Sequence, residues 1–272
     1  MTCLGTGDAL GVPAPLCDCE YCTESDRRRR PGLLVESGDT TVLLDVPPDV
    51  TEGLHATGTT SLDGVFATHA HYDHFHGVHE LNHTQYEQHV WNEDDYDHPH
   101  PLADDLTVYG NDSVLKHVHS QTPHLTERLD FEALNLGEEE QVGPLTVEPF
   151  RVDHGGPLFH TQGYVVTGPS GDDGGSGPSA ETAAVAYAPD ANSLDPNPLP
   201  SVDLLFVEGS LLGPELHADA EELREQVARV DADRVVPTNV SEHQAELHTA
   251  ALEAHASDLG YEVWEDFQTA VV

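Results

Sequence analysis

Short apolar runs alternate with glycine-, proline- and acid-rich breaks along the whole chain. In the first half, the runs at 33–36 and 42–44 are separated by Ser37-Gly38-Asp39, which predicts a β-hairpin. Residues 63–68 predict a further strand, and a helix is expected after it over 74–83. The other elements expected in this half are a short strand over 3–7 that enters a glycine turn, a strand over 106–109 and a helix over 114–118.

The second half repeats this alternation. The Gly-, Ser- and Asp-rich stretch 168–181 predicts a flexible hairpin tip, and the acidic, proline-broken stretch 92–105 predicts a surface loop. Two strand-rich halves with outer helices fit an α/β sandwich, which we expect to form one domain over 1–272. Its later elements are strands over 145–152, 164–166, 185–188, 204–207 and 234–237, and helices over 218–230 and 244–259.

Four side chains able to bind a metal follow the apolar run 65–67 within six residues: His69, His71, Asp73 and His74. Strand alternation places the first three on one side of an extended segment, with the fourth adjacent as the chain turns. Neutral imidazole suits zinc, iron or manganese, and a nearby carboxylate supports a second, harder cation. A chance cluster is the alternative, since the chain carries 19 histidines.

The charge of the chain is extreme, with 50 acidic and ten basic residues and a formal net charge of −40. Such an excess is strongly self-repulsive in dilute buffer, but at about 1 M salt the Debye length falls to about 3 Å. This composition, in which Lys116 is the sole lysine, is typical of a cytoplasmic protein from an extreme halophile. An acidic disordered protein is excluded, because apolar strand-like segments run through the whole length.

The same charge argues against a nucleic-acid partner or an anionic membrane surface, which would require a basic patch. The basic run Arg27 to Arg30 either steers a phosphate or is a solvated entry to the next strand, and we favour the second. Neither a signal peptide nor an apolar run of 18 residues is present, so we expect a soluble, cytoplasmic protein. Disulfides are then not expected for the four cysteines.

The spacing of the motif that begins at His69 resembles the metallo-β-lactamase superfamily, which argues against a chance cluster. The resemblance implies a four-layer αβ/βα sandwich with metals held between the two sheet edges. It also implies later ligands at the ends of two strands, where this chain offers His154 and Asp190. The expected ligands are His69, His71, His154 and Asp190 for the first metal, and Asp73, His74 and Asp190 for the second.

The last ligand expected in that superfamily is a histidine after a late strand, and this chain has Asn239 there. An amide oxygen is a weaker ligand than imidazole. Three arrangements remain open: Asn239 binds weakly, His243 takes its place, or water does. We expect a binuclear zinc or manganese site with a weaker second metal.

Three cysteines, Cys17, Cys19 and Cys22, lie within six residues, a spacing that suits a tetrahedral metal. With the preceding Gly11-Val12-Pro13, this knuckle resembles the branch that contains phosphoribosyl cyclic phosphate phosphodiesterases and pyrroloquinoline quinone B proteins. The resemblance implies a structural zinc held by these cysteines and a histidine near the last metal-ligand position, which His243 matches. Cys3 lies in a strand and is expected to be a buried small hydrophobic residue.

The resemblance implies a metal-dependent hydrolase that cleaves a small phosphate ester, cyclic or open, with a metal-bound hydroxide. Asp73 would orient the attacking water, and His217, in a segment that resembles one with a phosphate-contacting histidine, would act as general acid. Two alternatives are a tRNase-Z-like endonuclease, which would need a basic RNA-docking arm, and a non-hydrolytic cofactor-biosynthesis or binding protein of the pyrroloquinoline quinone B type. Family members are often dimers, so a homodimer is an expectation as well.

Overall fold

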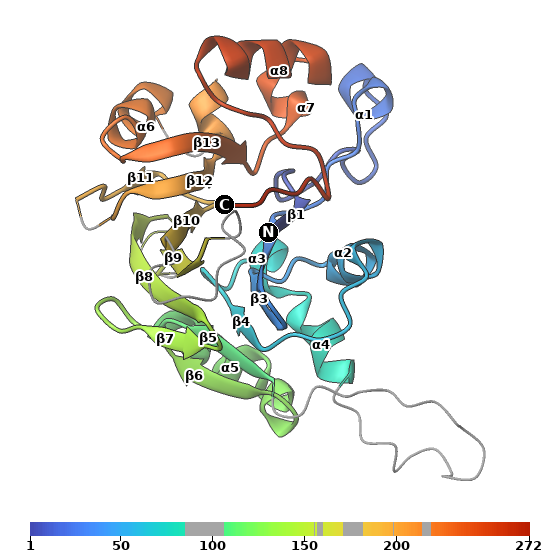
Figure 1. Cartoon of the computed structure of the whole chain (residues 1–272). Helices are drawn as coiled ribbons and strands as arrows, with labels where there is room; N and C mark the ends of the chain where they lie inside the picture. Colours follow the sequence, from blue (N-terminus) through green and yellow to red (C-terminus); the bar gives the residue numbers. More distant parts are fainter. Residues whose placement is uncertain (85–105, 155, 157–159, 171–181, 198, 214–218) are drawn as a thin grey trace.

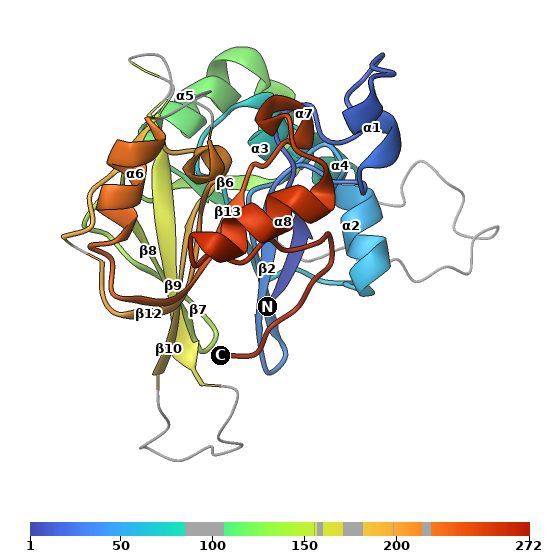
Figure 2. The same cartoon turned by 90° about the horizontal axis from the view of Figure 1, so that it is seen from above.

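Two β-sheets face each other in the computed structural model of the chain (Figures 1 and 2). The structure describes residues 1–84, 106–154, 156, 160–170, 182–197, 199–213 and 219–272. The first sheet has the order β1-β2-β3-β4-β5-β6, antiparallel from β1 to β3 and parallel from β3 to β6. Its strands are β1 (Thr2–Gly5), β2 (Gly32–Ser37), β3 (Thr40–Leu44), β4 (Gly64–Phe66), β5 (Thr107–Gly110) and β6 (Asp130–Ala133).

The second sheet has the order β11-β8-β9-β10-β12-β13, with β7 paired to β8. Strands β8, β9 and β10 form an antiparallel meander, and β10, β12 and β13 are parallel. Its strands are β7 (Glu140–Val142), β8 (Leu145–Asp153), β9 (Gln162–Pro169), β10 (Thr182–Ala188), β11 (Ser193–Leu194), β12 (Val202–Glu208) and β13 (Ala232–Thr238).

Helices cover the outer faces of both sheets (Figures 1 and 2). Helices α2 (Val50–Thr57), α4 (Val78–Thr84) and α5 (Asp112–Gln121) pack on the first sheet, and α6 (Ala220–Val227) packs on the second. Between the sheets, an apolar cluster contains Leu33 and Phe66 from the first sheet with Tyr164 and Phe206 from the second. The result is the predicted four-layer α/β sandwich, because each sheet has one face buried on the other sheet and one face under helices.

Two predicted helices are each broken in the structure. The helix expected over 74–83 is instead α3 (Tyr72–Phe75) and α4, separated at Gly77, whose backbone N–H donates to the carbonyl oxygen of Val46 over 2.9 Å. The helix expected over 244–259 is α7 (Glu242–Ala245) and α8 (Thr249–Asp258), with Glu246 between them at a φ of 55°. Both breaks come from backbone contacts or turns that a hydrophobic pattern does not encode.

All the predicted strands are present, with shifts of up to three residues at their ends. In the predicted hairpin over 33–44, Leu33 pairs with Leu44. The sequence interpretation did not anticipate α1 (Glu20–Glu24), α2, β6, β7 or β11. The predicted loop at 92–105 and most of the tip at 168–181 lie outside the described residues.

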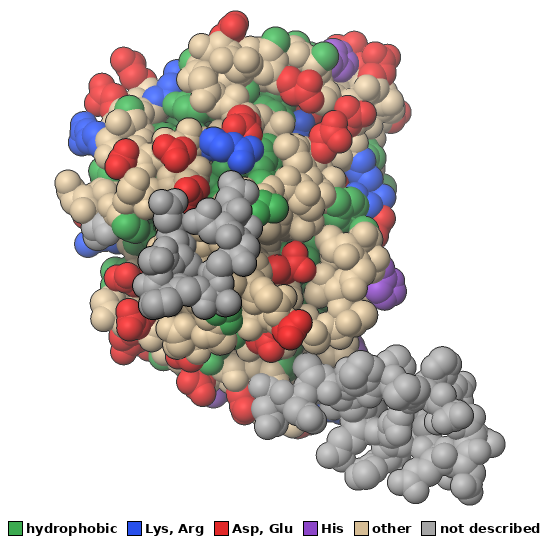
Figure 3. Space-filling model, in the orientation of Figure 1, with side chains coloured by type: hydrophobic (Ala, Val, Ile, Leu, Met, Phe, Trp, Pro, Cys, Tyr) green, Lys and Arg blue, Asp and Glu red, His purple; other side chains and the backbone are tan. Residues whose placement is uncertain are grey.

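Acidic side chains are spread over the molecular face drawn in Figure 3, while Lys and Arg form a few separate patches there. Among the described residues, no helix has the length and apolar character needed to cross a membrane.

Candidate metal centre

The ends of several strands bring the metal-capable side chains together. His69 and His71 lie in the segment after β4, and α3 then carries Asp73 and His74. His154 directly follows β8 in the second sheet. Asp190, two residues beyond β10, completes the set from that sheet. The centre therefore lies where the two sheets face each other at one edge.

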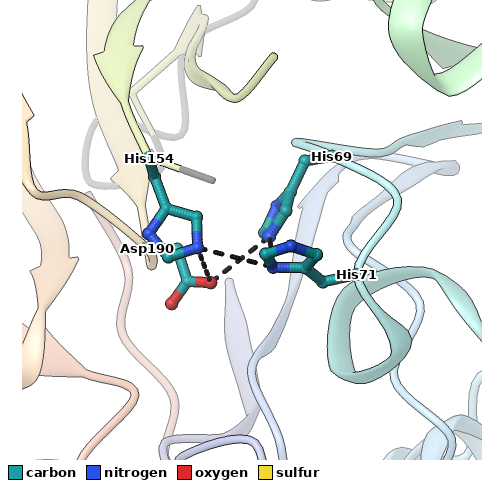
Figure 4. A group of neighbouring side chains, drawn as sticks. All are labelled: His69, His71, His154 and Asp190. Carbon is teal, nitrogen blue, oxygen red and sulfur yellow. Dashed lines mark hydrogen bonds and ion pairs between the residues drawn. The ribbon is translucent and has the colours of Figure 1, made fainter. Parts of the chain in front are cut away.

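The first group consists of His69, His71, His154 and Asp190, whose ligand atoms all lie within 4.8 Å of one another (Figure 4). The Nε2 atom of His69 is 2.8 Å from Nδ1 of His71 and 3.3 Å from Oδ2 of Asp190. The Nε2 atom of His154 is 3.2 Å from the same Asp190 oxygen and 3.4 Å from Nδ1 of His71. The four side chains converge on one point from both sheets.

The second group consists of Asp73, His74 and Asp190. Nε2 of His74 is 3.1 Å from Oδ2 of Asp73 and 3.3 Å from Oδ2 of Asp190. This is the same Asp190 oxygen that contacts His69 and His154. Asp190 thus belongs to both groups, as expected of a carboxylate that joins two adjacent metal sites.

The spacing of these atoms fits a metal ion. Ligand atoms that lie 2.0–2.1 Å from a tetrahedral zinc are about 3.3–3.4 Å from one another. Five of the separations given above, from 3.1 to 3.4 Å, are close to that value. Nε2 of His74 is also buried, and it faces the carboxylate oxygens of Asp73 and Asp190 without hydrogen-bond geometry to either, which suits a nitrogen that shares a metal with them.

A second set of polar side chains orients the ligands, and the sequence interpretation missed it. Asp45, which follows β3, is fully buried and lies 2.7 Å from Nδ1 of His74 through its Oδ2 atom. Its Oδ1 atom accepts hydrogen bonds from the backbone N–H and hydroxyl of Thr68, whose Oγ1 is 2.9 Å from Nδ1 of His69. Such contacts fix the ring that faces the metal. The sequence did carry a signal for Asp45, because it is a carboxylate directly after an apolar strand, as Asp190 is near the end of one.

Two ligands of the centre, His71 and Asp190, are held in the form that binds a metal. Burial lowers the pKa of His71 to about 4, and the charges of His69 and His154 act in the same direction, so His71 is neutral near pH 7. Burial opposes ionisation of Asp190, but the charge of His74 and the hydrogen bond from His69 hold its pKa well below the usual range. A neutral imidazole and an ionised carboxylate are the forms that bind metals.

His74 is not held in that form. Burial opposes its ionisation, but the charges of Asp190, Asp73 and Asp45 raise its pKa well above the usual value, so a metal must displace its proton.

Asn239, which directly follows β13, is 5% exposed and has a φ of 58°, in the left-handed region that asparagine tolerates. Its Nδ2 atom donates to Oδ1 of Asp190 and lies 3.4 Å from Oε2 of Glu208. Its Oδ1 atom is buried and has no hydrogen-bond partner among the described residues. Rotating the amide by 180° would turn this oxygen towards Asp190. The hydrogen bonds to Asp190 and Glu208 favour the orientation with the N–H group on that side.

Glu208, at the end of β12, is a further buried carboxylate beside the centre that sequence reasoning did not identify. It is 1% exposed, and its Oε1 atom accepts hydrogen bonds from the backbone N–H and hydroxyl of Ser210 at 3.1 and 3.2 Å. The amide of Asn239 lies between Glu208 and Asp190.

The three cysteines also come together, since the Sγ atoms of Cys17, Cys19 and Cys22 lie within 4.8 Å of one another. The backbone N–H of Cys22 lowers the pKa of the Cys19 thiol, which favours the thiolate that a metal needs. At Cys22 the backbone N–H of Ala14 acts in the same direction, but burial and the neighbouring thiols raise the pKa to about 11. His243 lies in α7 and is exposed. The group of close ligand atoms contains the cysteines without it, so its role as fourth ligand stays a prediction. The proposed general acid, His217, lies outside the described residues.

Residues 40–239 match the β-lactamase superfamily domain. The chain belongs to the β-lactamase superfamily. Together with the histidines and carboxylates above, this membership confirms the predicted metallo-β-lactamase sandwich and implies that the centre binds divalent metal.

Solved structures share the fold of this superfamily member over its whole length. A diphosphatase of the PhnP family has 20% sequence identity and a TM-score of 0.76, covering 99% of this chain and 97% of that chain. Zinc-bound PqqB from Methylobacterium extorquens has 16% identity and a TM-score of 0.75, covering 100% and 99%. Both agree with the branch that the cysteine knuckle predicted.

A curated relative is the octanoyltransferase of Porphyromonas gingivalis (strain ATCC BAA-308 / W83), which is 28% identical over 265 residues. The match covers 92% of this chain and 47% of that protein, so the chain spans about half the length of this relative.

Proposed function

We propose that this protein is a metal-dependent phosphodiesterase that acts on small phosphate esters, cyclic or open. The observation that carries the proposal is the double role of Asp190, whose Oδ2 atom lies 3.2–3.3 Å from ring nitrogens of His69, His74 and His154. A carboxylate shared by two ligand groups suits two ions about 3.5–4 Å apart, the arrangement of enzymes that displace groups at phosphorus.

Each residue of the centre has a part in this proposal. His69, His71, His154 and Asp190 hold the first ion, and Asp73, His74 and Asp190 hold the second. When bound, the ions supply Lewis-acid activation of water and of the phosphoryl oxygens. Asp73, 7% exposed and 3.1 Å from His74, orients the attacking water. His217 protonates the leaving oxygen of the ester.

Asn239 makes the second site the weaker of the two. In the orientation seen here, an N–H group faces Asp190, and an N–H group cannot bind a metal. Asn239 can serve as a ligand of the second ion only if the amide rotates, which ends its hydrogen bond to Asp190. Without that rotation, the second ion has the three ligands Asp73, His74 and Asp190, one fewer than the first ion.

We also propose that Cys17, Cys19, Cys22 and His243 hold a structural zinc. A Cys19→Ser variant should contain one zinc fewer per chain than the unsubstituted protein, measured by elemental analysis. A Cys3→Ala variant is the control, because Cys3 is buried in β1 away from the knuckle and should leave the zinc content unchanged. Equal zinc in all three proteins would reject the assignment.

The test of the main proposal is hydrolysis of bis(p-nitrophenyl) phosphate by Mn²⁺-loaded protein in about 2 M KCl, where surface charge is screened. Asp190→Ala should lose more than about 100-fold in turnover, beyond the 10- to 100-fold typical of contacts outside the ligand set. Asp130→Ala, at an exposed position in β6, should keep full activity. A metal-loaded, folded protein without turnover would reject the phosphodiesterase and favour the non-hydrolytic alternative.

The tRNase-Z-like alternative is less well supported. Of the ten lysines and arginines in the chain, Arg28, Arg29 and Arg30 are each engaged with a carboxylate, so the basic run is neutralised within the molecule. A surface that binds the phosphates of an RNA needs free cations. A small substrate that enters the metal centre does not need such a surface.

A further inference from the structure

A cavity of about 550 Å³ opens beside the metal centre. His154 of the first ligand group forms part of its wall, so the cavity adjoins the metal centre. The described residues around it come from the end of β8, the start of α5, the segment after β6 and the start of β9 with the residues before it. They include Asn111, Ser113, Asn135, Arg151, Asp153 and His160.

Most polar groups in this wall are already engaged with one another. Oδ1 of Asn111 accepts from the backbone N–H groups of Ser113 and Val114, and its Nδ2 atom donates to the carbonyl oxygen of His160 over 2.7 Å. The amide of Asn135 donates to the carboxylate of Asp112 over 3.4 Å. The start of α5 is therefore capped by its own neighbours.

Arg151 is different. It lies in β8 three residues before His154, on the same strand face as Leu145 and Val147, which pack between the sheets. Its guanidinium makes no ion pair or side-chain hydrogen bond with any described residue. The wall also carries the carboxylates of Asp112 and Asp153, yet neither lies within ion-pair distance of Arg151.

The chain has 50 acidic residues for ten basic ones, and most of the basic side chains pair with carboxylates. Arg27, Arg28, Arg29, Arg30, Arg229 and Arg234 do so, whereas the exposed residues Arg151 and Lys116 have no ion pair among the described residues, and of these two only Arg151 lines the cavity. A guanidinium that faces a cavity presents a planar fork of donors matched to carboxylate and phosphate oxygens.

We infer that Arg151 is a specificity-determining residue, which binds an anionic group on the part of the substrate that is not hydrolysed. The inference rests on the proposed function, because it places the reacting phosphate at the metal centre and the second anion in the cavity. Three residues of strand span about 10 Å, so a linker of a few carbons joins the two positions.

The test uses three p-nitrophenyl alkyl phosphodiesters that differ only at the end of the alkyl chain: a hydroxyl, a carboxylate or a phosphonate. The metal-loaded protein should prefer the anionic diesters to the neutral one by about tenfold or more in kcat/KM, carried mainly by KM. The carboxylate and phosphonate arms show which of the two anions the cavity favours.

Arg151→Gln should reduce the ratio between the anionic and neutral diesters to near one, and Arg151→Lys should restore part of it. Lys116→Gln is the matched control, because it removes one positive charge from α5 outside the cavity wall. It should keep the full preference. An unchanged ratio in Arg151→Gln, or an equal loss in Lys116→Gln, would overturn the inference.

Failure of the proposed function gives a different result, namely no turnover of any diester, the neutral one included. In that case calorimetric titration of the phosphonate diester into the metal-loaded protein still tests Arg151. Weaker binding to Arg151→Gln than to Lys116→Gln supports the inference, and equal binding to both rejects it.

Discussion

The metal centre depends on individual residues outside the ligand motif. Asp45 connects the ring of His74 to the backbone and hydroxyl of Thr68, and Thr68 in turn contacts His69. One buried carboxylate thereby orients ligands of both groups. Asn239 in turn donates to Asp190, the carboxylate that the two ligand groups share.

Replacing Asp45 by alanine should weaken metal binding by about 10- to 100-fold, because the rings of His74 and His69 lose the contacts that orient them. Competition titration of zinc against a chromophoric chelator measures this loss. Asp39→Ala, in the exposed turn between β2 and β3, is the control and should bind zinc like the unsubstituted protein. Unchanged affinity in Asp45→Ala would show that Asp45 serves folding alone.

Asn239→His should tighten the weaker metal site by about tenfold or more, because imidazole is a stronger ligand than an amide oxygen. Histidine also tolerates the left-handed φ of 58° found at this position. Equilibrium dialysis against Mn²⁺ gives the number and affinity of bound ions. Asn197→His, in a surface turn, adds the same ring elsewhere and should change neither. Identical binding curves for all three proteins would place Asn239 outside the metal site.

At the scale of elements, short connections and close approaches decide where helices stop. Gly77 separates α3 from α4, and a Cβ atom there would collide with the carbonyl oxygen of Pro47. The contact holds the start of α4 against the segment after β3, beside Asp45. A hydrophobic pattern continues through this position, so the sequence interpretation joined the two helices.

Gly77→Ala should destabilise the protein by about 1–3 kcal/mol, because backbone atoms must move to admit the methyl group. Urea unfolding in KCl, followed by circular dichroism, measures the change in the free energy of unfolding. Gly38→Asn is a control with open space and a φ of 60° that asparagine adopts, and it should change stability little. A loss no larger than that of the control would mean that the Pro47 contact relaxes freely.

At the scale of the whole molecule, a buried ion pair joins distant parts of the chain. Nε of Arg28 lies 2.7 Å from Oε1 of Glu242 in α7, and both side chains are at most 2% exposed. The same guanidinium donates to Oγ1 of Thr6 and to the carbonyl oxygen of Trp264. The segment after β1, the segment after the knuckle, α7 and the C-terminal segment thus meet at one side chain. The expectation of a solvated basic run is therefore wrong for Arg28.

Arg28→Ala should cost about 3–5 kcal/mol of unfolding free energy, because it leaves the Glu242 carboxylate buried without its cation. Arg229→Ala removes an exposed pair 3.8 Å apart and should cost less than about 1 kcal/mol. Both values come from urea unfolding at the same KCl concentration. Similar costs for the two variants would contradict the burial argument.

The net charge of −40 leads to a prediction for the molecule as a whole. The melting temperature should rise steeply between about 0.2 M and 2 M KCl, because salt screens the repulsion among surface carboxylates. Differential scanning calorimetry measures it. Sucrose, which does not screen charge, is the control and should raise the melting temperature far less. A flat salt dependence would contradict the proposal of adaptation to high salt.

The sequence by itself determined the class of the protein. The spacing of His69, His71, Asp73 and His74 after a strand is a local pattern, and apolar periodicity located most strands, since both depend on near neighbours in the chain. Only the tertiary structure decided how the centre is supported. Asp45 contacts Thr68 and His74, and Glu208 contacts Asn239, in each case across more than 20 positions of the chain. A local sequence pattern does not indicate contacts of this kind. The same holds for the pairing of Arg28 with Glu242 across 214 positions and for the unpaired guanidinium of Arg151 beside His154.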